Sequence, residues 1–461
     1  MKKKLLSFIL CAFLAVAAFA FAGCGNKNDG SITLFVYAQA HEEAAIRQMA
    51  AKYTEKTGTV VNVNAVSAES ESYWTKLKSY ASSKSMPDIF YMGPGQMEYY
   101  LNNNQLMDIG SYISANTEYD YEDLYGELRD EYVVDGKTYG IPGSFSVYPM
   151  GYNRVIIDQI IEAGWWPSDV LPPWEDDPAT GKQVVYTWDQ FSRAAAACTV
   201  GTDWYGTGLL ERWALHSWIW TAGADWLNAD KTKVTVTTPE FRKGLKDFYE
   251  LHRTRGAVQG VDSESAMNHY QRWLNGQEAF FNVGTWDVGG FDKLNSNKIE
   301  YGIMPCPRSD DPGSEWYTYS AFLGYSVAQT SKNPEKAVDF ILYYTTSQDA
   351  YDILVKENKI ILPATQSKQQ TYIDDPDITP VGKELFLTAM SEGHTKRLPT
   401  TYTYNSEWFD FFYANTTEFW GGPGLAPKYT TDEYLDWVEP QMQERLDRAL
   451  EQKAQDEARR K

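Results

Sequence analysis

Aromatic side chains are unusually abundant in this chain and could bind a ligand. The 461 residues include 16 tryptophans and 32 tyrosines, more than packing alone tends to require. Flat aromatic faces bind the C–H faces of sugar rings, and planar polar groups bind the hydroxyls at the rims. The composition therefore favours carbohydrate binding. The aromatic residues that we select as candidate ligand contacts are Tyr37, Phe145, Trp213, Trp218, Trp220, Trp286, Tyr319 and Trp408.

The polar and small candidates come from loops that follow expected strands or lie beside an aromatic candidate. Asp287 could accept two hydroxyl hydrogen bonds, or cap the helix that follows it. Arg397 could bind a uronate carboxylate through two hydrogen bonds, or form a surface ion pair. Gly93 would let a ligand approach the backbone, although a Gly-Pro-Gly turn forms without one. These candidates are Gln39, Glu43, Gly93, Pro94, Gln96, Ser144, Asp287, Ser320 and Arg397.

Each aromatic candidate also has a packing explanation. Trp213, Trp218 and Trp220 lie on one expected helix. Trp213 and Trp220 are seven residues apart and share a helix face, so the hydrophobic core is the alternative for this pair. Trp286 follows an expected strand and could instead pack the two domains together. Spacing alone does not choose between a ligand contact and a core position.

Catalytic and metal-binding motifs are missing from the sequence. His41, Glu42 and Glu43 resemble the start of the zinc motif H-E-x-x-H, but the second histidine is absent and the five histidines are scattered. Neither a phosphate-binding P-loop nor a G-x-S-x-G nucleophile motif occurs. We therefore expect no metal site or cofactor and none of the enzyme classes that depend on these motifs.

Two rival functions stay open. A glycosidase needs two carboxylates across a cleft, and 62 acidic residues neither identify nor exclude such a pair. A binding protein for iron or a polyamine is the second rival, because adjacent tyrosines bind ferric iron in some proteins. The pairs Tyr99-Tyr100 and Tyr343-Tyr344 lie in helix-like, partly apolar segments, where core packing explains them better.

Residues 31–92 alternate between strand and helix patterns. Strands are expected at 31–37, 60–66 and 87–92, and helices at 41–57 and 73–83. This order predicts crossover connections and a largely parallel sheet, in which ligands bind beyond the carboxyl ends of the strands. Loops 37–43 and 92–96 are therefore expected at the site.

The remainder of the chain has mixed patterns and is too long for one core. About 430 residues outside the leader indicate two domains. Residues 165–183 are rich in Pro, Asp and Gly and are expected at the surface, and Asn333 is expected to cap a helix that begins at Pro334. The other expected strands are 145–152, 279–283 and 299–304, and the other expected helices are 188–198, 209–222, 239–255, 264–275 and 432–457.

The start of the chain has the features of a secretory leader. Lys2, Lys3 and Lys4 precede an apolar run from Leu5 to Phe21, as in a signal peptide. The segment ending at Cys24 resembles a bacterial lipobox, with Phe21 where leucine is usual, and it is followed by a polar stretch that ends at Gly30. We expect a signal peptide at 1–23 and a lipidated tether at 24–30 with the lipid on Cys24. Ordinary secretion and an uncleaved anchor are the alternatives.

The net charge indicates which partners to expect, and the cysteine spacing indicates the state of the thiols. The net charge is −20, and removal of residues 1–23 would make it more negative. Such a surface repels nucleic acid and anionic lipid, so neutral or cationic solutes or a protein are the expected partners; acidity that only keeps the protein dissolved is the alternative. Cys198 and Cys306 match neither a zinc site nor a disulfide framework. Buried free thiols are expected, with a bridge between the two as the alternative.

A series of local motifs resembles family 1 of the extracellular solute-binding proteins, the maltose-binding-protein group. No single motif is specific, but together they follow the family order over about residues 31–365. Segments 165–186 and 385–430 match least well. The motifs are FVY at 35–37, YTEKTG at 53–58, PDIF at 87–90, DGKTYGIP at 135–142, GYN at 151–153, TWDQF at 187–191, WLNGQEA at 273–279 with GTW at 284–286, SKNPEKA at 331–337 and LPA at 362–364.

The resemblance implies the type II periplasmic-binding-protein fold, with two α/β lobes that close on a ligand by hinge motion. It implies hinges near 142–147, 303–309 and 355–362. The implied lobes are residues 31–143 plus 306–358, and residues 144–305 plus 359–461.

The resemblance also bears on function. It places Trp286 where the family has a stacking aromatic, Trp408 near a late aromatic, and Ser144 and Phe145 at the first crossing, with Tyr319 and Ser320 near the lobe interface. The implied function is a monomeric receptor without enzymatic activity. It would be lipid-anchored outside the cytoplasmic membrane and deliver an oligosaccharide to the permease of an ABC importer.

Overall fold

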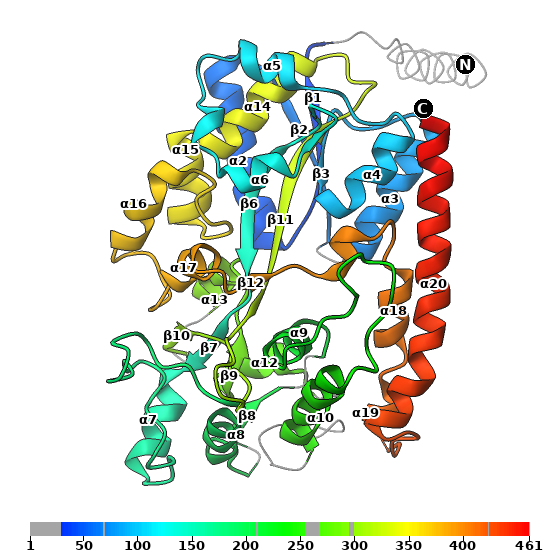
Figure 1. Cartoon of the computed structure of the whole chain (residues 1–461). Helices are drawn as coiled ribbons and strands as arrows, with labels where there is room; N and C mark the ends of the chain where they lie inside the picture. Colours follow the sequence, from blue (N-terminus) through cyan, green and yellow to red (C-terminus); the bar gives the residue numbers. More distant parts are fainter. Residues whose placement is uncertain are drawn as a thin grey trace, which may run out of the picture.

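Two β-sheets, one above the other in Figure 1 and each covered by helices, form the frame of the molecule. The computed structural model describes residues 29–67, 70–201, 203–208, 211–253, 267–294, 299–422 and 424–460. The expected leader and Cys24 lie outside these residues. Among the helices described, none combines the length and the apolar character that a bilayer span demands.

The first sheet is built from both ends of the chain. Strand β1 pairs in parallel with β2 and β3, which confirms the parallel arrangement expected from the alternating pattern. β11 then pairs antiparallel with both β3 and β6, and parallel with β12. The helices between the first three strands are α2 (Ala40–Thr57) and α3 (Ser70–Ser83). The strands are β1 (Ile32–Ala38), β2 (Val61–Ser67), β3 (Ile89–Met92), β6 (Ile141–Val147), β11 (Thr318–Val327) and β12 (Thr395–Lys396).

The second sheet has the order β10-β7-β9-β8 and is buried throughout. Helices cover it in Figure 1, as expected for a sheet whose strands are apolar on both faces. Its strands are β7 (Met150–Asn153), β8 (Tyr205–Thr207), β9 (Glu278–Asn282) and β10 (Tyr301–Met304). The surrounding helices are α7 (Arg154–Glu162), α8 (Trp188–Ala197), α9 (Glu211–Thr221), α10 (Pro239–Arg253) and α12 (His269–Leu274).

The chain passes between the sheets where one strand was expected. β6 ends at Val147 in the first sheet, and β7 begins at Met150 in the second. The single strand expected over 145–152 is therefore wrong, because Tyr148 and Pro149 divide it. Proline has no backbone N–H to donate to a sheet, so it favours a break at this point.

The remaining elements surround this frame. Pro334 is the first residue of α14 and Asn333 occupies the N-cap position, as expected, but the Asn333 side chain makes no capping hydrogen bond. The Asn333 side-chain amide instead donates to the backbone oxygen of Ser31 at 2.9 Å. These elements are α4 (Pro94–Asn102), α5 (Gly110–Ala115), α6 (Gly126–Asp130), β4 (Val133–Val134), β5 (Lys137–Thr138), α13 (Val288–Leu294), α14 (Pro334–Thr346), α15 (Gln348–Ala350), the π-helix η2 (Tyr351–Glu357), α16 (Gln369–Asp374), α17 (Leu385–Ser391), α18 (Glu407–Ala414), α19 (Thr417–Trp420) and the 3₁₀ helices η1 (Tyr121–Asp123), η3 (Gln366–Lys368) and η4 (Pro399–Tyr402).

Helix α20 (Thr431–Arg460) runs along both lobes at one side of the molecule (Figure 1). Tyr434, Leu435 and Met442 on its first half are fully buried in the core of the second lobe. Near its far end, the Lys453 ammonium pairs with the Glu98 carboxylate of α4 at 3.0 Å. One helix therefore contacts elements of both lobes.

Both remaining cysteines are buried free thiols, as expected, and they form no bridge with each other. Cys198 lies in the core of the second lobe, and Cys306 packs beside Trp316. Burial raises the pKa of the Cys306 thiol to about 11, so both residues act as small apolar groups.

Candidate functional site

Tyrosines gather at the carboxyl ends of the central strands of the first sheet. Tyr37 closes β1, and its ring centroid lies 5.5 Å from that of Tyr91 on β3. The Tyr325 ring on β11 lies 5.0 Å from Tyr91, and its hydroxyl donates to the Tyr91 hydroxyl at 3.5 Å. Tyr37 and Tyr91 are half-buried.

The second lobe contributes a stacked aromatic pair. Trp286 follows β9 and is half-buried. Its ring stacks on that of Tyr148, with centroids 5.6 Å apart and planes 7° from parallel. The ring also folds over Gly284, where a Cβ atom would lie 2.3 Å from the indole. Glycine at 284 is thus required by close approach and helps to hold the Trp286 ring in place.

Two acidic side chains, one from each lobe, come together between these aromatic groups. Glu42 lies in the first turn of α2 and accepts a hydrogen bond from the Gln39 backbone N–H at 2.6 Å. Asp287 is buried at the start of α13 and accepts from the Gly284 N–H at 3.1 Å. The Gln39 side chain also hydrogen-bonds to the Asp287 carboxyl, which joins the two lobes directly.

Glycines let α13 approach this junction closely. A Cβ atom on Gly290 would lie 3.0 Å from the His41 ring, at the start of α2. A Cβ atom on Gly289 would lie 1.9 Å from the backbone oxygen of Asn358, which follows η2. The two adjacent glycines therefore allow α13 to contact both the first lobe and the chain's later crossing.

The electrostatics of the junction disfavour negative charge. Burial raises the pKa of Glu42 to about 7, against the stabilising hydrogen bond from Gln39. Burial, with a smaller contribution from nearby Glu42, raises the pKa of Asp287 to about 8. Burial and Glu42 also raise the pKa of Tyr37 to about 12. The site therefore brings together hydrogen-bonding groups and aromatic faces with little stabilisation of anions.

These pKa values predict a pH-dependent contact between the lobes. When the lobes separate, water reaches both carboxyl groups and their pKa values return toward about 4. Protonation then favours the joined lobes fully below about pH 4, and this preference is lost as the pH rises through 7 and 8. We expect the ratio of joined to separated molecules, in unliganded protein, to fall at least about tenfold between pH 5.5 and pH 9.

Small-angle X-ray scattering measures this as a larger radius of gyration at pH 9. The double variant Glu42→Gln, Asp287→Asn is the control, since it should lose the dependence. A radius that is constant with pH, or larger at pH 5.5, contradicts the prediction.

Some candidates from the sequence do meet here. Tyr37 and Gln39 from the first lobe lie at one junction with Trp286 and Asp287 from the second. Ser144 is half-buried on β6, and its hydroxyl donates to the Phe145 backbone oxygen at 3.0 Å.

Other aromatic candidates are core residues. Trp218 stacks on Trp188 at 5.0 Å within the second lobe. Trp408 is almost completely buried in the same core, Trp220 is almost completely buried and stacks on His216, and Phe145 is buried against Tyr125. The side chain of Trp213 lies outside the described residues. For the first four, the structure supports the packing alternative.

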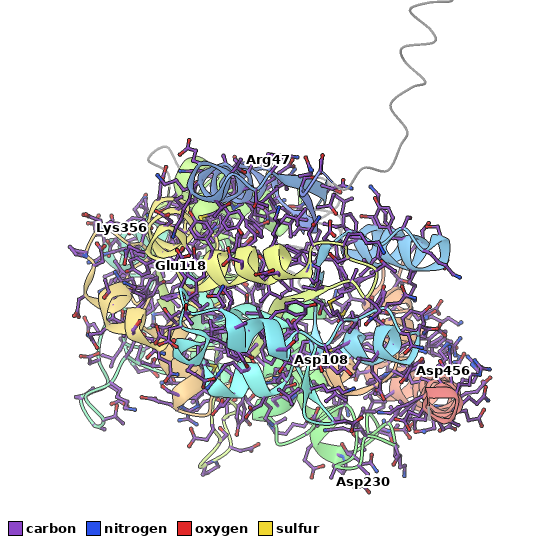
Figure 2. All side chains as sticks on the ribbon, turned by 90° about the horizontal axis from the view of Figure 1, so that it is seen from above. Arg47, Asp108, Glu118, Asp230, Lys356 and Asp456 are labelled. Atoms are coloured by element: carbon purple, nitrogen blue, oxygen red, sulfur yellow. The ribbon has the colours of Figure 1, made fainter. Side chains whose placement is uncertain are left out.

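Several polar candidates have partners elsewhere. Glu43 pairs with Arg47 one turn along α2, at 2.7 Å, and Figure 2 shows Arg47 at the periphery of the molecule. Arg397 pairs with Glu131 and lies over the Phe322 ring. Both charged side chains thus form ion pairs within the protein, and for Arg397 the ion-pair alternative is the one observed.

The last candidates lie at the edges of the site. Gly93 and Pro94 begin α4, next to an exposed Gln96. Tyr319 packs partly against the second-lobe core, and its backbone oxygen accepts the Tyr148 N–H at 3.1 Å. Ser320 is buried, and its hydroxyl donates to the Lys396 backbone oxygen at 3.4 Å.

The sequence candidates omit several residues of the junction. Glu42, rather than its neighbour Glu43, lies at the junction. The spacing of Glu43 and Arg47 could have shown this, because oppositely charged residues four apart on a helix pair readily. Tyr91 was also predictable, since it lies near the end of a strand beside β1. Tyr148 had no clear signal, because its position depends on how the lobes meet.

The adjacent tyrosine pairs proposed for iron are packed in the first lobe. Tyr100 is buried, and the Tyr99 ring packs against it edge-on at 5.1 Å. Tyr343 and Tyr344 are both buried in the core cluster around α14. Core packing therefore explains both pairs.

Comparison with known proteins gives the same architecture. Over 90% of this chain and 99% of the other, the fold matches an ABC substrate-binding protein from Listeria monocytogenes in complex with cycloalternan, with a TM-score of 0.74 and 20% identity. A maltotriose-binding protein from Thermus thermophilus, bound to maltotriose, matches over 90% and 99% with a TM-score of 0.66 and 18% identity. The type II periplasmic-binding-protein fold, with two α/β lobes joined by a hinge, is thus the fold of this chain.

Sequence comparison points the same way. The arabinooligosaccharide-binding protein of Halalkalibacterium halodurans is 28% identical over 240 residues, which cover 50% of this chain and 49% of that protein. The chain thus spans about half the length of this relative. Residues 48–380 match the family model described as bacterial extracellular solute-binding protein. That match covers well over half of the chain, and the protein belongs to the bacterial extracellular solute-binding protein family.

Proposed function

We propose that this protein binds an oligosaccharide between its two lobes, closes on it by hinge motion, and delivers it to an ABC importer. The observation that carries the proposal is the half-buried Trp286, stacked on Tyr148 and placed at the lobe junction with Gln39, Glu42 and Asp287. An aromatic face beside amide and carboxyl groups is the combination that sugar rings require.

The names of similar proteins support a saccharide ligand. They include binders of arabinooligosaccharide, cycloalternan and maltotriose. We infer a receptor without enzymatic activity, because the family is one of solute-binding proteins. A sugar that binds and stays intact is the corresponding expectation.

The proposal includes a location for the protein and bounds for its two lobes. We propose that residues 1–23 are a signal peptide and that a lipid on Cys24 holds the protein outside the cytoplasmic membrane through the tether at 24–30. Residues 31–143 plus 306–358 would form one lobe, and 144–305 plus 359–461 the other. The monomer would dock on the permease subunits of its transporter.

A thermal-unfolding screen tests the proposal. A ligand that binds only the native protein adds about 2.7 kcal/mol of stability at a concentration 100 times its dissociation constant. We expect one class of oligosaccharide to raise the unfolding midpoint by several degrees and to be recovered intact. Monosaccharides, iron and spermidine are the comparison ligands. A shift with iron or spermidine alone would refute sugar binding, and cleavage of the sugar would refute a receptor role.

A further inference from the structure

The acidic pair at the lobe junction has an unusual environment. Gln39 links the two acids, since its backbone N–H donates to Glu42 and its side chain hydrogen-bonds to Asp287, and the nearby Glu42 charge raises the pKa of Asp287. Asp287 is 4% exposed and Glu42 is half-buried. Moving a carboxylate out of water is costly unless a cation or strong hydrogen bonds compensate.

The protein supplies no cation to either carboxylate within the part of the chain that the structure describes. Arg397 is paired with Glu131, and Lys359 is paired with Asp292. His41 adjoins Glu42 in the chain, and its ring packs against Gly290 on α13. The other titratable groups whose charge interacts with Glu42 or Asp287 are the tyrosines Tyr37, Tyr91, Tyr148, Tyr270, Tyr301 and Tyr344.

Without a cation, protons must neutralise the pair when the lobes meet. The raised pKa values of about 7 for Glu42 and about 8 for Asp287 express this requirement. A neutral sugar would leave this need for protonation unchanged. A positively charged ligand group would remove it, because each carboxylate could then ionise beside an opposite charge.

The groups around the acids also suit a cation. A positive charge is attracted to the faces of aromatic rings within about 6 Å. The Trp286 and Tyr148 rings lie on the second-lobe side, and Tyr37 and Tyr91 on the first. An ammonium group donates three hydrogen bonds, and each ionised carboxylate has about four acceptor positions. Glu42 and Asp287 thus keep acceptor capacity after the hydrogen bonds from Gln39 and Gly284.

We propose that the oligosaccharide carries a protonated amino group, as an amino sugar does, and that this ammonium lies between Glu42 and Asp287. This inference rests on the proposed function and adds the charge of the ligand to it. The aromatic faces would hold the sugar rings, and the acidic pair would select amino sugars over neutral ones.

The test compares matched ligands by isothermal titration calorimetry at pH 7. The best neutral saccharide from the thermal screen is measured beside the set of its amino-deoxy derivatives, one for each hydroxyl of a sugar unit, and their N-acetyl forms. We expect at least one amine to bind at least tenfold tighter than the neutral parent, and its N-acetyl form to lose this gain. Binding of amino saccharides alone, with no neutral saccharide bound, would also support the inference.

Variants assign the effect to the acids. Glu42→Gln and Asp287→Asn should each weaken amine binding at least tenfold and should not weaken neutral-sugar binding, because an amide takes up no proton when the lobes meet. Glu43→Gln, which removes the adjacent outward-facing acid, is the matched control and should change neither. Unfolding midpoints of all three verify that the variants are folded.

The outcomes separate the inference from the function on which it rests. Equal or weaker binding of every amino derivative overturns the amino-sugar inference and leaves sugar binding intact. Undiminished amine affinity in both Glu42→Gln and Asp287→Asn overturns it as well. If no saccharide of either charge binds, the proposed function itself fails.

Discussion

Replacing Trp286 with alanine is expected to weaken oligosaccharide binding roughly 30- to 100-fold, or about 2–3 kcal/mol, as for a central aromatic contact. The indole is half-buried, so part of its surface is available to a ligand, while the Tyr148 ring supports its other face. Stability should change little, by no more than about 1 kcal/mol, because the ring lies outside the lobe cores. Calorimetric titration and chemical denaturation measure the two effects separately.

Trp165 provides the matched control for this variant. It is 58% exposed and lies just after α7 of the second lobe, where its backbone N–H donates to the Ile160 oxygen. Trp165→Ala removes the same side chain and should leave affinity unchanged within about twofold. Equal affinity of Trp286→Ala and the unmodified protein would mean that the stacked pair has no part in binding.

The sequence was most informative about regular elements with strong periodicity. The expected strand–helix–strand order at the start of the chain is confirmed by the parallel pairing of β1 with β2 and β3. The reason is physical: apolar residues must face a core at the period of each element, and this leaves a readable pattern. The loop at the end of β1 was accordingly placed at the site.

Individual side chains in the loops were harder to assign. Glu42 and Glu43 are neighbours, yet one faces the other lobe and one pairs outward with Arg47. A helix turns about 100° per residue, so adjacent positions face different surroundings. Only the pairing with Arg47 carried a sequence signal. The contact with Asp287 did not, because it joins residues of two lobes far apart in the chain.

The tryptophans show a second limit of prediction from sequence. Trp218, Trp220, Trp286 and Trp408 are all sequence candidates for ligand contact, but three of them are core residues. The second lobe fills its interior with aromatic rings, such as Trp226 against Phe241, Phe409 and Phe412. Aromatic abundance therefore reports on packing in this lobe as well as on ligand binding.

Replacing Trp408 with alanine is expected to lower the free energy of unfolding by about 3–5 kcal/mol, the usual cost of deleting a buried tryptophan. Its ring is fully buried beside Phe409, and its indole N–H donates to the Thr403 hydroxyl at 3.0 Å. The variant leaves a cavity in the core to which α18 and α20 both contribute. Urea denaturation, followed by tryptophan fluorescence and far-UV circular dichroism, measures the loss.

Trp408→Phe separates the two contributions of this side chain. It keeps most of the ring volume and loses the hydrogen bond to Thr403, so we expect a smaller loss of about 1–2 kcal/mol. Below the unfolding transition, both Trp408 variants should bind the oligosaccharide with unchanged affinity, since the ring is sealed within the second lobe. This is the reverse of the result expected for Trp286→Ala. A Trp408 variant with lost affinity and full stability would instead place this residue in the binding site.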